Sequence, residues 1–292
     1  MKVGMTLPIM EPGLNADMLE TWSRTVDEGP WSSLAFGERM AFDNPDTIAL
    51  LGATAAWTKR VRLVTTVIVA QLHDPVMLAK ALATADMLSK GRLSVGLGLG
   101  GRDEDYRAAG ADLSLRTNAE VAHRARIMKR VWAGEKVVET IEPVGPPPVQ
   151  KGGPELLAGA QGPKSIRLAA SWADGVSGFS FDLNVRSQKE IFDLAREAWK
   201  QEGRPTPRLT TAFWFAIGDI ARPQVQKHLR RYMNWIDKAA LESMLPTVGF
   251  AGTAAELKEG LKRIADLGAD ETLLIPTSDD LDQVKRAADV IG

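Results

Sequence analysis

The chain has 292 residues, 45% of them hydrophobic, and a formal net charge of -1 from 36 basic and 37 acidic side chains. The near-neutral charge argues against nucleic acid or an anionic membrane as a partner, because no overall field would draw the chain to either. The absence of cysteine excludes disulfides, thiolate metal sites and a cysteine nucleophile.

The N-terminus, MKVGMTLPIM, lacks the charged region, long apolar run and cleavage site of a signal peptide, and it is predicted to form a strand. Apolar runs such as VRLVTTVIVA have about half the length that a helix needs to span a bilayer. We therefore expect a soluble cytoplasmic protein.

Strand-like runs rich in Val, Ile, Leu and Thr alternate with segments of helical periodicity. The predicted strands span 2–7, 32–36, 61–69, 92–98, 155–159, 174–178, 208–217 and 271–276. The predicted helices span 15–28, 45–57, 75–89, 118–133, 163–172, 182–202, 253–267 and 279–291. Their predicted end signals are Asn44-Pro45, Asp74-Pro75, the capping box of Thr253 with Glu256, and the C-terminal glycines Gly91 and Gly268.

Eight strand-helix alternations predict an α/β protein with a parallel (β/α)₈ TIM barrel, in a single domain covering 1–292. A doubly wound sheet would leave two or three units unplaced. Two insertions interrupt the repeat. The segment 134–154 is predicted to form a short hairpin and a proline-rich loop, and 219–250 is predicted to form extra helices over one end of the barrel.

A glycine motif, Gly96-x-Gly98-x-x-Gly101, follows the fourth predicted strand. A dinucleotide-binding fingerprint would stand in the first strand-helix unit and lead straight into a helix, with an acidic residue at the next strand end. Here three units precede the motif, a polar loop is predicted to follow it, and Glu120 lies within the next helix. The motif instead suggests a strand end where backbone can approach a flat ligand, although glycine could also relieve crowding in the barrel wall.

The stretch TKRVRLVTTVIVAQLHDPVMLAKALATADMLSKGRLSVGLGLGGRDEDYRAAG, residues 58–110, resembles the bacterial-luciferase-like superfamily of flavin- and deazaflavin-dependent oxidoreductases. Segments 126–135, 156–176 and 249–275 agree with the same pattern. The resemblance implies a barrel, usually a homodimer, that binds reduced flavin mononucleotide (FMN) or the deazaflavin coenzyme F-420 at the carboxyl ends of its strands.

With reduced FMN, such proteins use oxygen to oxidise small organic substrates as monooxygenases, and with F-420 they transfer hydride. A loosely bound flavin would be supplied by a partner flavin reductase. A non-catalytic paralogue that binds a flavin or a fatty ligand is the alternative.

Glu38 and Arg39 are the candidate catalytic residues, because many deazaflavin enzymes of the family carry an Asp-His pair at this place. This sequence departs from that pattern, so an ion pair that shapes the pocket and direct catalysis by Glu38 are both open. Arg39 stays protonated and so cannot act as a general base, but it could bind an anionic substrate or the charge at flavin N1.

The resemblance also implies cofactor-binding residues at three strand ends. Ile68, Val69, Ala70 and Gln71 match the place where members often carry a bulge or a non-proline cis peptide behind the isoalloxazine ring. Around the fourth strand the candidates are Gly98, Gly100, Gly101, Arg102 and Tyr106. Luciferases hold the flavin phosphate with an arginine inside this motif; Leu99 stands at that position here, and Arg102 is the candidate substitute.

The sequence GAQGPKS, residues 159–165, opens a predicted helix after the fifth strand. Backbone N–H groups there, together with Gln161, Gly162, Lys164 and Ser165, suit a phosphate, although a plain capped helix explains the same residues.

The remaining candidates have structural explanations as well as functional ones. His73 is interpreted as a loop or capping residue, and His123 and His228 lack partners at ligand spacing, so no metal is predicted. Trp214, Met233 and Trp235 are candidates for lining the pocket or for the core.

Overall fold

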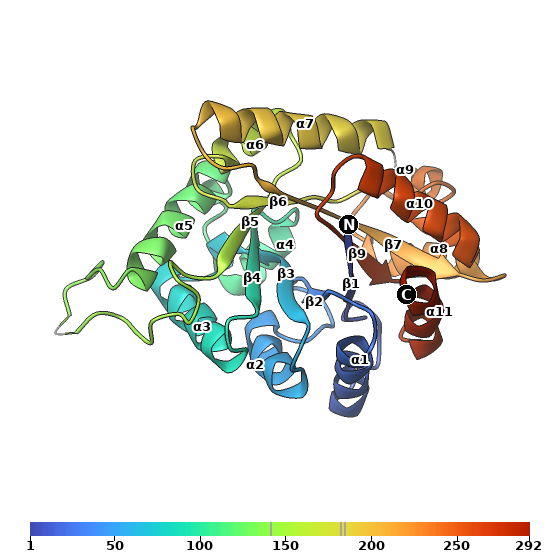
Figure 1. The fold of residues 1–292 in the computed structure, drawn as a ribbon, viewed down its shortest axis with the longest axis horizontal. Coiled ribbons are helices and arrows are strands. Elements are labelled where there is room, and N and C mark those ends of the chain that lie inside the picture. The colour runs from blue at the N-terminus through green and yellow to red at the C-terminus, as the bar shows by residue number, and fades with distance from the viewer. Residues whose placement is uncertain (141, 182, 184) are drawn as a thin grey trace.

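The computed structural model describes residues 1–140, 142–181, 183 and 185–292, and alternating strands and helices make up most of them (Figure 1). The strands are β1 (Lys2–Thr6), β2 (Ser33–Phe36), β3 (Arg62–Val69), β4 (Leu93–Gly98), β5 (Glu155–Gly159), β6 (Gly175–Ser177), β7 (Arg208–Ile217), β8 (Phe250–Gly252) and β9 (Glu271–Pro276). The helices are α1 (Ala16–Glu28), α2 (Thr47–Trp57), α3 (Pro75–Leu88), α4 (Asp103–Ala109), α5 (Asn118–Trp132), α6 (Pro163–Ala169), α7 (Val185–Gln201), α8 (Ala221–Tyr232), α9 (Lys238–Met244), α10 (Ala254–Asp266) and α11 (Leu281–Ile291).

Eight parallel strands close into a barrel. The order is β1-β2-β3-β4-β5-β6-β7-β9, and β9 pairs with β1 to complete the ring. The short β8 pairs only with the end of β7, where Phe250 is opposite Phe215. The predicted (β/α)₈ fold is therefore confirmed, and each of the eight predicted strands is found within one residue of its predicted ends. Because all strands are parallel, their carboxyl ends meet at one end of the barrel.

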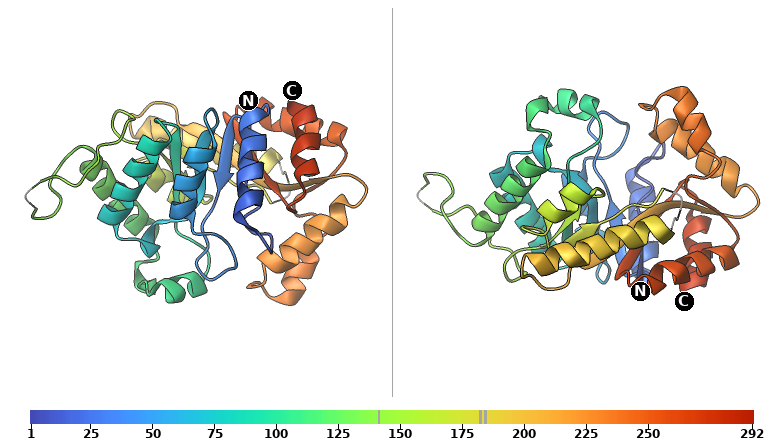
Figure 2. Two further views of the ribbon diagram at one scale, coloured as in Figure 1. Left: turned by 90° about the horizontal axis from the view of Figure 1, so that it is seen from below. Right: turned by 90° about the horizontal axis from the view of Figure 1, so that it is seen from above.

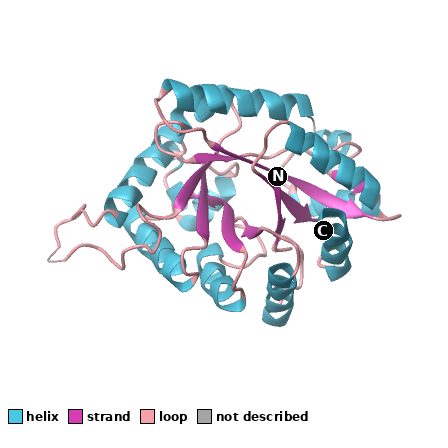
Figure 3. Cartoon of the chain, viewed as in Figure 1, coloured by secondary structure: helices cyan, strands magenta, loops and turns pink. Residues whose placement is uncertain are grey.

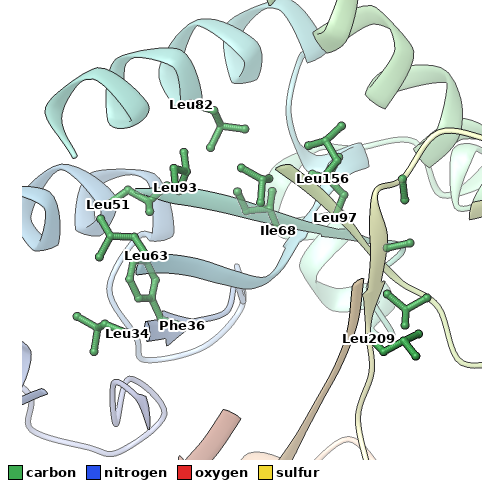
Figure 4. Close-up of a cluster of buried hydrophobic side chains, with 14 of the residues drawn as sticks. Leu34, Phe36, Leu51, Leu63, Ile68, Leu82, Leu93, Leu97, Leu156 and Leu209 are labelled. Atoms are coloured by element: carbon green, nitrogen blue, oxygen red, sulfur yellow. The ribbon is translucent and has the colours of Figure 1, made fainter. Parts of the chain in front are cut away.

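Helices cover the outside of the barrel through apolar contacts (Figure 3). Leu51 of α2 and Leu82 of α3 lie beside Leu63 of β3 and Leu93 of β4, and all four side chains are fully buried (Figure 4). Each such leucine removes enough apolar surface from water to contribute about 1.5–3 kcal/mol. This shell fixes the directions of the strands and thereby the positions of the residues at their ends.

A polar network fills the barrel interior near the amino ends of the strands. Arg208 of β7 forms ion pairs with Glu155 of β5 and Glu271 of β9. Arg62 of β3 donates to Ser94 Oγ of β4 at 2.5 Å, and this hydroxyl donates to Glu155 at 2.6 Å. Charged side chains thus join strands across the barrel at the end away from the loops that follow the strands.

The two insertions differ from each other in structure. The segment 219–250 contains α8 and α9, as the sequence predicts. The segment 134–154 contains no strand in its described residues, so the predicted hairpin is not found, and Figure 1 shows a long loop that extends away beyond α3 and α5. Pro146, Pro147 and Pro148 supply no N–H donors, which disfavours a strand ladder in this segment.

Two local predictions are wrong. Residues 103–109, predicted as part of a polar loop, form α4, because three acidic residues in its first turn favour the positive helix end and Gly110 closes it at φ 66°. The second helix begins at Thr47 with Asp46 as its N-cap, not at Asn44-Pro45, since the Asp46 carboxylate accepts from Ala49 N at 2.7 Å.

The other end signals are confirmed. Asp74 caps α3, Thr253 and Glu256 form the capping box of α10, and Gly91 and Gly268 adopt positive φ. Among the described residues, no helix combines the length and apolar character that crossing a membrane requires.

Candidate active site

A cavity of about 620 Å³ lies at the carboxyl ends of the strands, within the range of pockets that hold small molecules. Its walls come from residues in or after the eight barrel strands, from the start of α5, and from the segment around α8 and α9. Figure 2 shows α4 on one side and α8 with α9 on the other, both projecting from this end of the barrel. The cavity therefore occupies the place where barrels carry their active sites.

Main chain forms the wall at β3 and β4. The register of β3 shifts between Thr65 and Ile68, and the Thr66–Val67 peptide bond is cis, two residues before the predicted segment 68–71. A Cβ at Gly98 would lie 2.5 Å from Val67 Cγ2, and one at Gly96 or Gly159 would lie 3.1 Å from Val67 Cγ1. These three glycines leave room for the bulged Val67, so relief of crowding explains Gly96 and Gly98.

The other glycines of the motif lie at the cavity rim. Gly100 has φ +68°, and a Cβ there would lie 2.9 Å from Val69 Cγ1, so both conformation and packing favour glycine. At Gly101 a Cβ would meet no atom within 4 Å. Together with Gly98 and Leu99 they line the cavity; the bulged β3 explains the glycines at 98 and 100, and no packing contact explains Gly101.

The carboxylate of Glu38 holds the end of β3. Its Oε2 accepts from Val69 N at 2.8 Å, its Oε1 lies 2.7 Å from His73 Nε2, and its own N–H donates to Val67 O at 3.1 Å. The side chain is 3% exposed and borders the cavity. Both carboxylate oxygens therefore have a partner. His73, interpreted from the sequence as a loop or capping residue, is one of these partners.

Arg39 points away from the cavity lining. It donates to Glu104 at 2.8 Å and to Tyr232 O at 3.2 Å, and its guanidinium carbon lies 4.2 Å from the centre of the Phe42 ring. Burial lowers the pKa of Arg39, and the nearby charge of Arg102 lowers this pKa further. The guanidinium remains a cation that ties three segments together.

Arg102 is the only cation in the described cavity lining, and Glu38 is the only acidic residue there. Its guanidinium carbon lies 3.7 Å from the ring centre of Trp235 and 5.0 Å from that of Tyr232. This arrangement joins the loop after β4 to the segment between α8 and α9.

The predicted segment 68–71 contributes only Val69 to the lining. Ile68 and Ala70 are fully buried in the core, and Gln71 donates to Thr117 O at 3.0 Å. Tyr106 is also buried and donates to Leu99 O at 2.7 Å, and burial raises its pKa. These four residues shape the wall from behind.

At the start of α6, two of the four predicted residues line the cavity, namely Gln161 and Ser165. Gly162 N donates to Ser165 Oγ at 3.2 Å, and this hydroxyl donates back to Gly162 O at 2.9 Å. Lys164 is exposed outside the lining. This end of the cavity therefore presents the side-chain amide of Gln161 and the hydroxyl of Ser165, at the first turn of α6.

Aromatic residues line the other side. Trp214 of β7 and Trp235, candidates from the sequence, border the cavity, as does Met233. Phe179 and Phe181, which follow β6, were not predicted; the rings of Phe179 and Trp214 are 4.6 Å apart. The alternation of aromatic residues in GFSF is the only sequence signal for them.

Two hydroxyl groups at the cavity floor were also missed from the sequence. Thr66 of β3 and Ser177 of β6 both line the cavity, and their oxygens are 3.3 Å apart. His228 lies behind the aromatic wall, where its Nδ1 pairs with Glu11 and its ring stacks on Tyr232. Within the described residues there is no group of three or more possible metal ligands.

Comparisons with known proteins agree with this architecture. The family model described as luciferase-like monooxygenase matches residues 26–273. An uncharacterised protein of Mycobacterium tuberculosis is 33% identical over 161 residues, which are 53% of this chain and 56% of that protein. A putative coenzyme F-420-dependent oxidoreductase of the same organism is 29% identical over 195 residues, covering 57% and 55% of the two chains. The chain thus matches little more than half the length of these relatives.

Two solved structures share the fold over nearly all of both chains. A monooxygenase from Streptomyces bottropensis has a TM-score of 0.80 at 22% identity, covering 99% of this chain and 97% of that one. An F-420-dependent secondary alcohol dehydrogenase in complex with an F-420–acetone adduct has a TM-score of 0.78 at 16% identity, covering 100% of both. Since the family model covers most of the sequence, the chain belongs to the luciferase-like monooxygenase family.

Proposed function

We propose that the chain is an oxidoreductase that binds reduced FMN or coenzyme F-420 in the cavity and acts there on a small organic substrate. The observation that carries the proposal is the large cavity at the carboxyl ends of the strands, with a main-chain wall on one side and aromatic side chains on the other. A relative named as an F-420-dependent oxidoreductase supports it.

The residues present fit a flavin or deazaflavin ring. The backbone at Gly98, Gly100 and Gly101, with Val67 and Val69 behind it, provides a surface against which a flat ring can lie. Gln161 and Ser165, with Asn118 nearby in the lining, would hold the polar tail. The bound ring would supply the electron pair for the redox reaction.

The other residues of the cavity bind and orient the substrate. Thr66 Oγ1 and Ser177 Oγ can donate to an oxygen of an alcohol or carbonyl substrate, because both hydroxyls face the same space. Phe179, Trp214 and Tyr232 exclude water from the apolar part of the substrate. The leucine at position 99, in place of the luciferase arginine, favours F-420 or a loosely held FMN delivered by a flavin reductase.

Cofactor binding is tested by titrating the purified protein with FMN and with F-420 while fluorescence quenching is followed. We expect saturable binding of at least one of them below about millimolar, as a pocket of this size buries most of a ring of this kind. Absence of binding by both would contradict the proposal.

A non-catalytic binding protein is the second candidate, favoured by one observation. Glu38 is the only acidic residue in the described lining, and both of its oxygens already have partners. The two candidates differ in turnover. If the bound cofactor keeps its redox state when alcohols, aldehydes or ketones are added, the chain is a binding protein.

We also propose a homodimer through the outer faces of α2 and α3. α2 carries no charged residue, and Met77 and Leu88 of the neighbouring α3 are 68% and 51% exposed. The outer face of α3 carries the exposed Lys80, but the charge-free outer face of α2 is unusual for a helix in contact with water.

Light scattering is expected to give twice the chain mass of 31.7 kDa for the natural protein. The exposed substitution Ala56→Glu on α2 should give a monomer, because a charge would be buried at the interface. Ala255→Glu, exposed in the first turn of α10, is the matched control and should leave the dimer intact. A monomeric natural protein would contradict the proposal.

A further inference from the structure

Arg102 is buried without the hydrogen bonds that a guanidinium requires. Its side chain is 10% exposed, and it lines the cavity. No N–H of this side chain donates a hydrogen bond to any residue that the structure describes, and Nε is fully buried without a partner. The nearest carboxylate oxygen, Oδ2 of Asp105, is 3.8 Å from Nη1, beyond hydrogen-bonding distance.

The surroundings of Arg102 fix its orientation and leave its N–H groups without acceptors, although carboxylates balance the charge: Glu104 pairs with Arg39, and Asp105 lies beside Arg102. Trp235 covers the guanidinium at 3.7 Å, which leaves the N–H groups at its edge as the available donors. Arg39 lies close enough for the two charges to repel, and its Nε is also unpaired. Asp105 offsets the charge of Arg102 without a hydrogen bond: its Oδ1 is held by Met40 N and Ala41 N, and its Oδ2 stays 3.8 Å from Nη1.

A buried cation with unpaired donors is costly, and an oxyanion removes the cost by accepting two parallel hydrogen bonds from the guanidinium. We propose that Arg102 binds the carboxylate of an otherwise apolar substrate, which makes the substrate class of the cavity an aromatic or aliphatic organic acid. This assignment rests on the proposed function, because it assumes that the cavity is a substrate site. The apolar part would lie against the aromatic residues, including Phe179 and Trp214.

The position of Arg102 favours the substrate over the phosphate of the cofactor. Arg102 contacts Tyr232 and Trp235, on the aromatic side of the cavity. Asn118, Gln161 and Ser165 instead line the same cavity at its β4–β5 side. These polar groups offer the tail of a cofactor a place away from the aromatic side, and Arg102 is left for a second anion.

The experiment is calorimetric titration of the cofactor-free protein with phenylpropionate and with its neutral amide, phenylpropionamide. The natural protein is expected to bind the acid at least about tenfold more tightly than the amide, as charge-assisted hydrogen bonds dictate. Arg102→Gln should lower the affinity for the acid to that for the amide, by about tenfold or more, and leave the amide unaffected.

Arg107→Gln is the matched control, because Arg107 is on α4, the helix that Arg102 caps, its side chain is 68% exposed and it is outside the cavity lining. It should leave the affinity for the acid unchanged. The melting temperature of Arg102→Gln checks that the variant is folded; it should fall by only a few degrees, because the variant loses the contact with Trp235 and the weak pair with Asp105 but no hydrogen bond to a described residue.

Three outcomes overturn the inference. In the first, the natural protein binds acid and amide equally, or binds neither measurably. In the second, Arg102→Gln binds the acid as tightly as the natural protein does. In the third, Arg102→Gln loses affinity for FMN alone, while riboflavin and the acid bind as before. The last outcome would assign Arg102 to the cofactor phosphate. Because the acid titration contains no cofactor, its failure is distinct from a failure of the FMN and F-420 titrations.

Discussion

Replacing Arg208 by methionine is expected to lower the free energy of unfolding by about 3 kcal/mol, since it removes the ion-pair partner of a buried carboxylate. Glu271 is 2% exposed, whereas Glu155, which shares the same guanidinium from the opposite strand, is 23% exposed. The charge of Arg62 acts on both carboxylates and remains, which places the loss at the lower end of what breaking a buried pair costs. Chemical denaturation followed by circular dichroism measures the effect.

Arg24→Met is the matched control for this loss. Arg24 pairs with Glu20 on the surface of α1, where the side chains are 51% and 39% exposed, and such pairs contribute about 0–1 kcal/mol. If both variants lost the same small amount, the interior network would not stabilise the barrel. Binding of FMN or F-420 by the folded fraction of Arg208→Met should persist, because Arg208 is at the opposite end from the cavity.

The second large effect is expected for Glu38→Ala, at about 3 kcal/mol, because the buried Val69 N–H loses a charged acceptor and nothing replaces it. His73 loses its partner in the same variant. The end of β3 should then loosen, and the affinity for FMN or F-420 should fall with it. Thermal unfolding and the cofactor titration measure the two consequences.

Glu38→Gln separates the two roles that the sequence left open for this residue. The amide oxygen of glutamine can still accept from Val69 N, so most of the stability and cofactor affinity should return if Glu38 acts by positioning β3. A Glu38→Gln variant with natural stability and cofactor affinity but a turnover reduced by more than about a hundredfold would instead show that the carboxylate handles a proton.

The barrel could be predicted because its sequence signals are local and repeated. Runs such as 208–217 are mostly apolar over their length, as a buried parallel strand is, and this one is bounded by Pro207 and Gly218. β8 was missed because its three residues, Phe250–Gly252, are too few to show a periodic pattern. α4 was missed because its seven residues are mostly polar, although its acidic first turn and Gly110 were readable signals.

The site was predictable only in part, because the sequence indicates which residues end a strand but not where their side chains point. Of the residues singled out in the sequence, Glu38, Gly98 and Arg102 border the cavity, whereas Arg39 and Tyr106 are outside its lining and bond to other partners. The pairing of Glu38 with His73, 35 residues later, depends on the closure of β2 against β3. The contact between Arg102 and Trp235 depends on how α8 folds over the barrel.

The two sides of the cavity differ in how many amino-acid substitutions they can accept, because the glycines around Val67 are confined to one side. The half at β3 and β4 is made of backbone, and a side chain at Gly96 or Gly98 would collide with the bulge. The opposite half, from Phe179 to Trp235, is made of side chains that point into open space. New substrates can therefore be accommodated by exchanging residues on one side only, while the surface proposed for the cofactor keeps its shape.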